Sequence, residues 1–261
     1  MSMRSVGKFI ARGLSRLIPP SVAERGVHFF EAIQGIGTGA EFSSRELDAI
    51  FNQVREPTPV IFDAGAHNGN FLQGALKRCP TDGTFHAFEP ANVTFRRLHE
   101  RFKDRPNVRL NRSALSSTSG SGILFYDEPG SQLASLSPRA LFGQAKTEGV
   151  RLETIDEYCE KSGIAQIHLL KLDVEGRELE ALQGASEMLK HRAVYRILFE
   201  FGGCNIDARA FFRDLYELLT RSGMAISRVM PSGKLLPIRA YDESLERFRV
   251  TNYLASLTRP Y

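Results

Sequence analysis

The chain has 261 residues, of which 42% are hydrophobic and 25% are charged. These values exclude a wholly disordered chain, a collagen-like chain and a disulfide-stapled miniprotein. The net charge of +4 is too small to require a nucleic acid partner, and we expect none. The sequence contains no uninterrupted apolar run of about 18 residues, so it predicts no membrane-spanning helix. Three widely spaced cysteines, without a CxxC pair, predict free thiols and a cytoplasmic protein.

Residues 1–18 have the pattern of a basic amphipathic helix. Basic residues recur every four positions, at Arg4, Lys8, Arg12 and Arg16. They share one side of a helix whose other side is apolar, and the pattern ends at Pro19. We expect this helix to pack on the protein's own core or on a partner subunit. Contact with an anionic membrane surface, at the inner membrane face, is the alternative, and a transit peptide also fits the composition.

Pro57 and Pro59 mark a predicted boundary between an N-terminal helical extension, residues 1–56, and a second domain, residues 57–261. Within the extension, residues 22–56 are predicted to be helical. The second domain alternates strands predicted at 60–62, 84–88, 108–110, 167–172 and 194–199 with helices predicted at 71–78, 93–102, 179–189 and 207–219. This alternation predicts a doubly wound α/β sheet.

The end of the chain predicts two more strands, at 224–230 and 249–255, with no helical pattern between them. Without a crossover helix, they are expected to be antiparallel neighbours. Residues 127–149 interrupt the alternation with a long segment that contains prolines and glycines. Long loops in compact domains are commonly functional or disordered, and we expect this one to form a lid over an acceptor molecule.

The strongest chemical signal follows the strand at 60–62, in the loop Asp63-Ala64-Gly65-Ala66-His67-Asn68-Gly69. A tight glycine turn lets a ligand approach the backbone, and the helix that follows offers free N–H groups. The next strand ends at Glu89, whose carboxylate can accept two hydrogen bonds from a ribose diol. The spacing from Asp63 to Glu89 suits one βαβ unit and predicts a nucleoside site.

The glycine loop lacks the GxGxxG fingerprint of dinucleotide sites, because Ala66 and His67 stand between its two glycines. Asp63 stands directly at the end of the strand, which suits a nucleoside whose tail carries an ammonium group. S-adenosylmethionine has such a tail. An NAD-dependent oxidoreductase, and a tight turn without any ligand, are the alternatives.

Two later strands also end in carboxylates, at Asp173 and at Glu200. Lys171 and Asp173 point to the same side of a strand, so an ion pair between them is the alternative to a catalytic role for Asp173. Glu175 is expected to open the next helix, where an acid suits the helix dipole. Because the carboxyl ends of parallel strands meet at one edge of a sheet, the four strand-end acids are expected to line one crevice.

These motifs resemble the FkbM family of methyltransferases. The resemblance covers about Val60 to Glu200 and rests on the loop at 63–69, on Ala87-Phe88-Glu89-Pro90 and on Leu170-Lys171-Leu172-Asp173-Val174-Glu175-Gly176. It implies a class I S-adenosylmethionine-dependent methyltransferase, a Rossmann-like fold with a seven-stranded sheet whose last strand is antiparallel. It also implies O-methylation of a small-molecule or glycan hydroxyl on a sugar, a glycolipid or a polyketide-like natural product.

The resemblance also implies roles for single residues. Glu89 would hold the ribose, and Ser113-Ala114-Leu115 would lie near the adenine. His67 departs from the family, in which asparagine is common at that position. The candidate cofactor-binding residues are Asp63, Gly65, Ala66, Asn68, Gly69, Glu89, Ser113, Ala114 and Asp173.

The cofactor supplies an electrophilic methyl group, so the protein must place an acceptor hydroxyl and take its proton. Asp173 is the first candidate for this base by its position, with Glu200 and His67 as further candidates. A divalent cation between Asp173, Glu200 and the hydroxyl is an alternative. No ligand spacing such as HxxxH supports it, and no metal site is predicted.

Two further classes of function are alternatives. Nucleic-acid methyltransferases of this fold often carry an N-P-P-Y-like run after the fourth strand, where Asp173-Val174-Glu175-Gly176 stands instead. A non-catalytic adaptor would bind S-adenosylmethionine without turning it over.

Overall fold

A computed structural model describes residues 17–258, so the helix predicted over residues 1–18 lies almost entirely outside the described residues. Two helices precede the sheet, α2 (Pro20–Ile33) and α3 (Ser44–Phe51), as predicted for this part of the chain. Helix α3 begins with a capping box: the Ser43 hydroxyl accepts the N–H of Glu46, and the Glu46 carboxylate accepts the N–H of Ser43.

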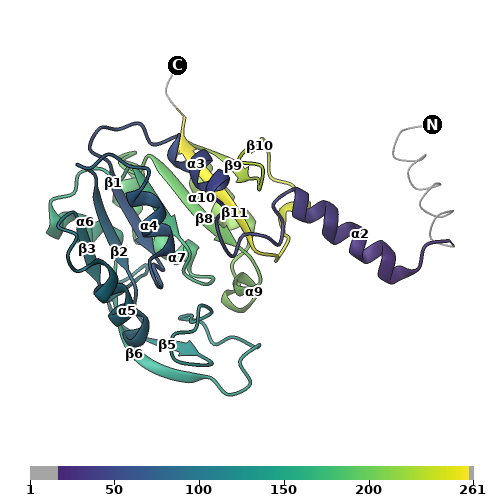
Figure 1. Ribbon diagram of the computed structural model, residues 1–261, viewed down its shortest axis with the longest axis horizontal. Coiled ribbons are helices and arrows are strands. Elements are labelled where there is room, and N and C mark those ends of the chain that lie inside the picture. Colours follow the sequence, from purple (N-terminus) through teal and green to yellow (C-terminus); the bar gives the residue numbers. More distant parts are fainter. Residues whose placement is uncertain (1–16, 259–261) are drawn as a thin grey trace.

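The centre of the molecule is an eight-stranded sheet in the order β10-β9-β11-β8-β7-β1-β2-β3 (Figure 1). Its strands are β1 (Val60–Ala64), β2 (Thr84–Phe88), β3 (Val108–Asn111), β7 (Leu169–Leu172), β8 (Arg196–Phe201), β9 (Met224–Val229), β10 (Leu235–Ile238) and β11 (Thr251–Leu257). Strands β3, β2, β1, β7 and β8 are mutually parallel, and β11 runs antiparallel between β8 and β9. The predicted doubly wound fold and its antiparallel last strand are therefore confirmed.

Strand β10 adds an eighth strand to the seven that were expected. The Met230 N–H donates to the carbonyl of Lys234, and this turn folds the chain back onto β9. Pro237 obscured the strand in the sequence, because proline lacks the N–H that a central strand needs. Among residues 17–258, β10 pairs only with β9, and proline is tolerated on such an edge.

Helices cover both faces of this sheet, and each face has its own hydrophobic core. The remaining helices are α4 (Asn70–Leu76), α5 (Asn92–Phe102), α6 (Ile155–Ser162), α7 (Glu178–Gln183), α8 (Ser186–Lys190), α9 (Cys204–Ala208) and α10 (Phe212–Arg221), with a 3-10 turn at Glu243–Leu245. Phe62 belongs to one core and its neighbour Ile61 to the other, as the alternation of a strand requires. Leu47 and Ile50 of α3 pack into the Ile61 core. The boundary at 56/57 stays a prediction.

The helix predicted from Asp207 is two helices. Helix α9 ends at Ala208, and α10 begins after Phe211, whose N–H donates to the carboxylate of Asp214. Asp207 is therefore not the start of α10. Its carboxylate accepts the N–H of Ala140 instead.

A second, three-stranded sheet was missed by the sequence analysis. Its order is β4-β6-β5, formed by β4 (Ala114–Leu115), β5 (Gly120–Tyr126) and β6 (Lys146–Glu153). Strands β5 and β6 form a long antiparallel pair, so the loop predicted at 127–149 ends at residue 145. The sequence concealed the pair because apolar and polar residues do not alternate cleanly along it: Ile123 is exposed, whereas Leu124 and Val150 are buried in a small core with Ala91.

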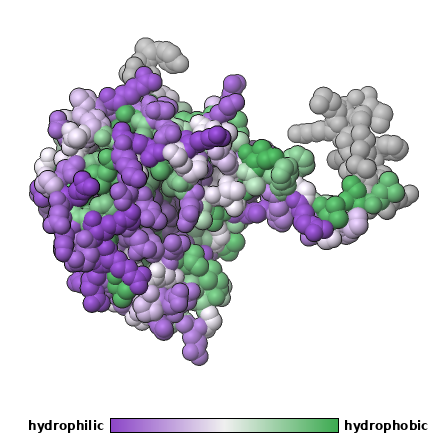
Figure 2. Space-filling view, in the orientation of Figure 1, coloured by the Kyte–Doolittle hydropathy of each residue, from purple (hydrophilic) through white to green (hydrophobic). Residues whose placement is uncertain are grey.

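Helix α2 projects from the body of the molecule, and none of its residues is buried (Figure 1). Figure 2 shows hydrophobic residues along this projecting arm. Those with large exposed side chains are Val22, Val27, Phe29, Phe30 and Ile33. Glu31 joins the helix to the body through ion pairs with Arg247 and Arg249. Among residues 17–258, no helix is both long enough and apolar enough to cross a membrane.

Candidate active site

A cavity of about 610 Å³ lies at the carboxyl ends of the central parallel strands. Its wall combines the glycine loop, the strand ends, the loop at 127–145 and the segment that joins α2 to α3. The predicted site residues in the wall are Gly65, Ala66, His67, Asn68, Glu89, Ser113, Ala114, Asp173 and Glu200. The structure therefore brings together most of the predicted site. Asp63 and Gly69 are not among the residues of the wall.

The glycine loop is held against two neighbouring segments. Gly65 has a φ of +73°, and a Cβ atom there would lie 1.8 Å from the backbone oxygen of Asp173, so only glycine fits. The N–H groups of Gly65 and Ala66 both donate to the carbonyl of Phe88 at 3.0 Å. Gly69 faces away from the cavity, because a Cβ atom at this position would meet the ring of Phe102 at 2.3 Å. Gly69 thus packs α4 against α5.

Asn68 presents an unused hydrogen-bonding group at the cavity. Its side-chain oxygen is buried and has no partner among the described residues. Arg101 fixes the loop from outside by donating to the backbone carbonyl of Asn68 at 2.6 Å. A buried acceptor without a partner is costly, so a ligand that donates a hydrogen bond here is favoured.

Glu89, at the end of β2, is oriented by two backbone groups. One carboxylate oxygen accepts the N–H of His67 and the other accepts the N–H of Ala91, both at 2.9 Å. Burial raises the pKa of Glu89 to about 7. Each oxygen keeps a second lone pair, so the carboxylate can still accept both hydroxyls of a ribose.

The far end of the cavity is largely apolar. Phe88, Ala114, Leu115 and Leu124 lie in its wall and offer a surface for a flat ring. Ser113 is also in the wall, but its hydroxyl donates to the carboxylate of Glu153 at 3.2 Å. This end suits the predicted adenine.

Lys171 lies in the cavity wall between two carboxylates. Its ammonium nitrogen lies 3.0 Å from Asp63 and 3.4 Å from Asp173, and it donates to the carbonyl of Gly65 at 3.0 Å. Burial opposes the charge, but the two carboxylates raise the pKa of Lys171 above its ordinary value. The side chain of Asp63 is only 2% exposed. Asp63 therefore positions Lys171 and does not reach the cavity, whereas Asp173, with a side chain 34% exposed, does.

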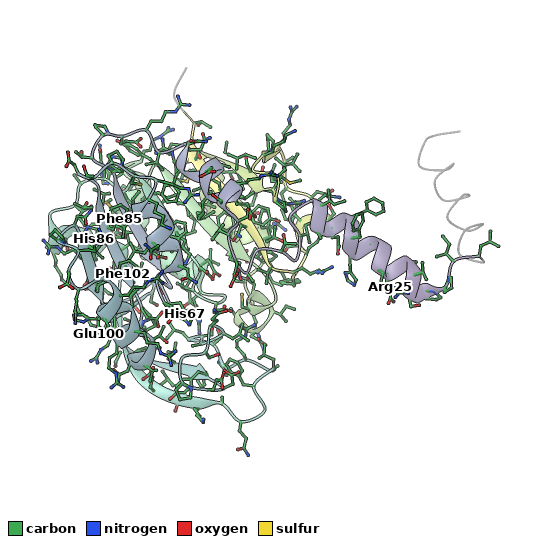
Figure 3. All side chains as sticks on the ribbon, in the orientation of Figure 1. Arg25, His67, Phe85, His86, Glu100 and Phe102 are labelled. Atoms are coloured by element: carbon green, nitrogen blue, oxygen red, sulfur yellow. The ribbon has the colours of Figure 1, made fainter. Side chains whose placement is uncertain are left out.

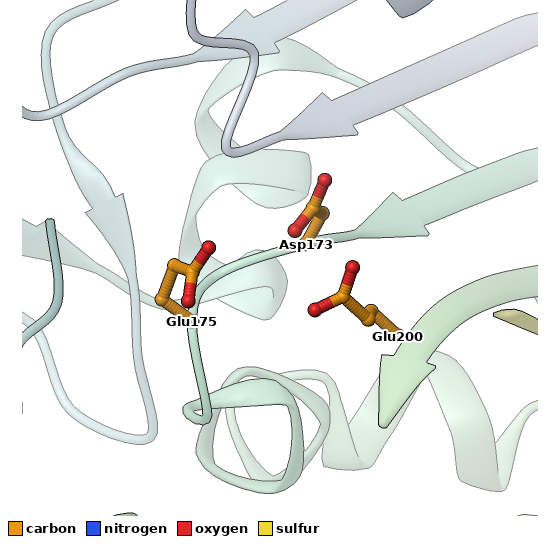
Figure 4. Close-up of side chains that lie close together, drawn as sticks. All are labelled: Asp173, Glu175 and Glu200. Carbon is orange, nitrogen blue, oxygen red and sulfur yellow. The ribbon is translucent and has the colours of Figure 1, made fainter. Parts of the chain in front are cut away.

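Three carboxylates gather at one side of the cavity, those of Asp173, Glu175 and Glu200 (Figure 4). One oxygen of each lies within 4.8 Å of the others. Burial, together with repulsion from Asp173, raises the pKa of Glu175 to about 8 and that of Glu200 well above its ordinary value. We call these three residues the acid cluster.

Glu175 was assigned to a helix start by the sequence analysis, and this is wrong. Helix α7 begins three residues later, at Glu178, and Glu175 has a φ of +53°, which is uncommon outside glycine. Its side chain turns toward the cavity and accepts a hydrogen bond from Arg139 at 2.6 Å. The glycine that follows Glu175 was the only signal of this turn in the sequence.

The loop at 127–145 is tied to this side of the cavity. Arg139 is buried and also lies 3.6 Å from Asp207, and the Ser135 hydroxyl donates to the backbone carbonyl of Glu175 at 2.7 Å. His67 reaches the same loop, with a ring nitrogen 3.2 Å from the carbonyl of Gly130 (Figure 3). Arg139 was not predicted from the sequence, because nothing in its neighbourhood in the sequence marks it. A lid role for this loop stays a prediction.

Residues 63–224 match a family model described as the methyltransferase FkbM domain. The chain belongs to the FkbM methyltransferase family. This membership confirms the resemblance found in the sequence, the predicted class of enzyme and the predicted cofactor, S-adenosylmethionine. It decides against the NAD-dependent alternative. The cavity fits this cofactor, since it offers an oriented carboxylate for the ribose, an apolar end for the base and an unpartnered polar atom on Asn68.

Three relatives were found for this FkbM-family chain. The hexuronic acid methyltransferase AglP of Haloferax volcanii is 36% identical over 141 residues, which are 52% of the chain and 53% of AglP. The 2-O-methyltransferase NoeI of Sinorhizobium fredii is 26% identical over 73% of the chain and 80% of NoeI. The 31-O-demethyl-FK506 methyltransferase FkbM of Streptomyces tacrolimicus is 28% identical over 50% of the chain and 61% of that protein. The chain thus spans about half the length of AglP.

Among solved structures, a precorrin-6y C5,15-methyltransferase from Geobacter metallireducens matches with a TM-score of 0.44 and 12% identity. The match covers 81% of this chain and 87% of that one.

Proposed function

We propose that this protein transfers a methyl group from S-adenosylmethionine to a hydroxyl of a sugar, a glycolipid or a polyketide-like molecule. The observation that carries the proposal is one continuous cavity that holds both Glu89, the predicted ribose contact, and the acid cluster. The names of the three relatives support an oxygen acceptor on a small or sugar-linked molecule. A wall rich in carboxylate oxygens suits a polyol, because each hydroxyl can donate a hydrogen bond.

Different residues act on the cofactor and on the acceptor, at two ends of the cavity. When bound, S-adenosylmethionine supplies a methyl group that is already electrophilic. Glu89 would hold the ribose, and the glycine loop would face the methionine moiety. Asp173 would accept the hydrogen bond of the acceptor hydroxyl and take its proton as the new oxygen–carbon bond forms. Lys171 supports this role by fixing the orientation of Asp173.

An acceptor screen tests the proposed function. The purified full chain is incubated with methyl-labelled S-adenosylmethionine and three sets of alcohols: hexuronic acid glycans, neutral sugars and glycolipids, and polyketide alcohols. Calorimetric titrations with S-adenosylmethionine and with NAD run in parallel. We expect binding of S-adenosylmethionine alone and label in an acid-stable, base-stable methyl ether. Binding without transfer to any alcohol would favour the adaptor alternative.

We also propose that residues 1–18 bring the protein to an anionic membrane surface. These residues lie almost entirely outside the described part of the chain, and the support comes from their basic pattern and from the exposed apolar side chains of α2. Pelleting with anionic liposomes, with and without residues 1–18, tests this. Equal binding of the two proteins would dispose of the proposal.

A further inference from the structure

We propose that a divalent cation binds at the acid cluster, between Asp173, Glu175 and Glu200. The three carboxylate oxygens lie within 4.8 Å of one another. An ion that binds oxygen at about 2.0–2.6 Å spans such a separation. The three residues come from the end of β7, from the turn that follows it and from the end of β8, so the fold holds them at fixed positions (Figure 4).

Glu200 provides the independent sign that a positively charged ligand belongs here. It is only 8% exposed, and its carboxylate points toward Asp173 and Glu175 (Figure 4). Within residues 17–258, no hydrogen bond or ion pair involves the Glu200 side chain. Leaving an ionised carboxylate buried and unpaired is costly, and proteins normally pair such groups or use them to bind metal ions.

The neighbouring cations do not fill this need, because both are engaged elsewhere. Arg139 bonds to Glu175 and approaches Asp207. Lys171 lies between Asp63 and Asp173. Neither forms an ion pair with Glu200, so this carboxyl group has no cationic partner among residues 17–258.

The donor set selects the kind of ion. All three ligands are carboxylates, and neither histidine nor cysteine belongs to the cluster. Oxygen ligands favour Mg²⁺, Mn²⁺ or Ca²⁺ over softer metals. The half-exposed Asp173 leaves the cavity side of the ion open, where two hydroxyls of an acceptor can complete its coordination and the ion can stabilise negative charge on the reacting oxygen. This last step rests on the proposed function, but binding of the ion does not.

Titration with Mn²⁺ tests the proposal on the full chain, with the free ion followed by its electron paramagnetic resonance signal. We expect one saturable site whose affinity falls by about tenfold or more in Glu200→Gln and in Glu175→Gln. Glu41→Gln is the matched control, because Glu41 lies in the cavity wall outside the acid cluster. Its affinity for Mn²⁺ is expected to equal that of the original protein. Circular dichroism verifies the folding of each variant.

Two results would overturn the cation site. One is the absence of saturable Mn²⁺ binding up to roughly millimolar concentration, which would instead favour a protonated amine on the acceptor as the partner of Glu200. The other is unchanged Mn²⁺ affinity in both Glu200→Gln and Glu175→Gln. Methyl transfer measured on the same samples separates the two proposals. Transfer without Mn²⁺ binding removes only the cation, and Mn²⁺ binding without transfer to any alcohol removes only the proposed function.

Discussion

The cofactor end and the acceptor end of the cavity are built in different ways. At the cofactor end, backbone N–H groups hold the key carboxylate: Glu89 accepts from His67 in the glycine loop and from Ala91 two positions on. At the acceptor end, side chains from distant segments meet: Arg139, Glu175 and Glu200. The chain itself orients Glu89 at the first end, whereas at the second end the buried Glu200 carboxylate has no partner among residues 17–258. One end is therefore preformed for a fixed ligand, and the other is completed by what it binds.

The largest expected effect is at Asp173, where a substitution should change turnover at the acceptor end but not binding at the cofactor end. We predict that Asp173→Asn lowers turnover by about 10²–10⁴-fold, because the amide can no longer take the proton of the acceptor hydroxyl. Binding of S-adenosylmethionine should be retained, since Glu89 and the glycine loop are untouched. Single-turnover kinetics and calorimetry measure the two quantities. A variant that turns over at the original rate would show that Asp173 is not the base.

At the cofactor end, we expect the largest effect from a substitution of Gly65. Gly65→Ala places a Cβ atom against the backbone oxygen of Asp173 in a left-handed conformation. We expect a loss of about 2–3 kcal/mol in the free energy of unfolding and a matching loss of cofactor affinity. Urea denaturation and calorimetry measure both. Gly149→Ala, where a Cβ atom would meet nothing, is the control, and equal stability of the two variants would contradict the packing of this loop.

The same contrast explains what the sequence could predict. The glycine loop, Glu89 and the parallel strands follow local patterns within one βαβ unit, and the structure places them as expected. Glu175 was misassigned because a turn with positive φ resembles a helix start in the sequence. Arg139 could not be found, because its partners Glu175 and Asp207 are 36 and 68 positions away and only the fold brings them together.

The pH dependence of cofactor binding sharpens the role of Glu89. Burial raises its pKa to about 7, so the carboxyl is protonated at lower pH and ionised at higher pH. The ribose hydroxyls donate hydrogen bonds to the ionised carboxylate. Where Glu89 is protonated, binding of S-adenosylmethionine must therefore release its proton. Affinity for S-adenosylmethionine should therefore fall by up to about tenfold between pH 8 and pH 6. Glu89→Gln should bind more weakly and lose this pH dependence, as calorimetry at both pH values can establish. An unchanged slope in the variant would assign the titration to another group.

The smallest effect concerns the attachment of the loop at 127–145 to the acceptor end. The hydroxyl of Ser135 is buried and donates to the backbone carbonyl of Glu175. Ser135→Ala removes this bond, which is worth about 1 kcal/mol. If the loop orders the acceptor, the KM for the acceptor should rise by about fivefold while cofactor affinity stays the same. Ser121→Ala, at an exposed position of strand β5, is the matched control. A change in cofactor affinity without a change in acceptor KM would contradict this role. It would mean that the loop at 127–145 serves the cofactor end, through the contact between His67 of the glycine loop and the carbonyl of Gly130.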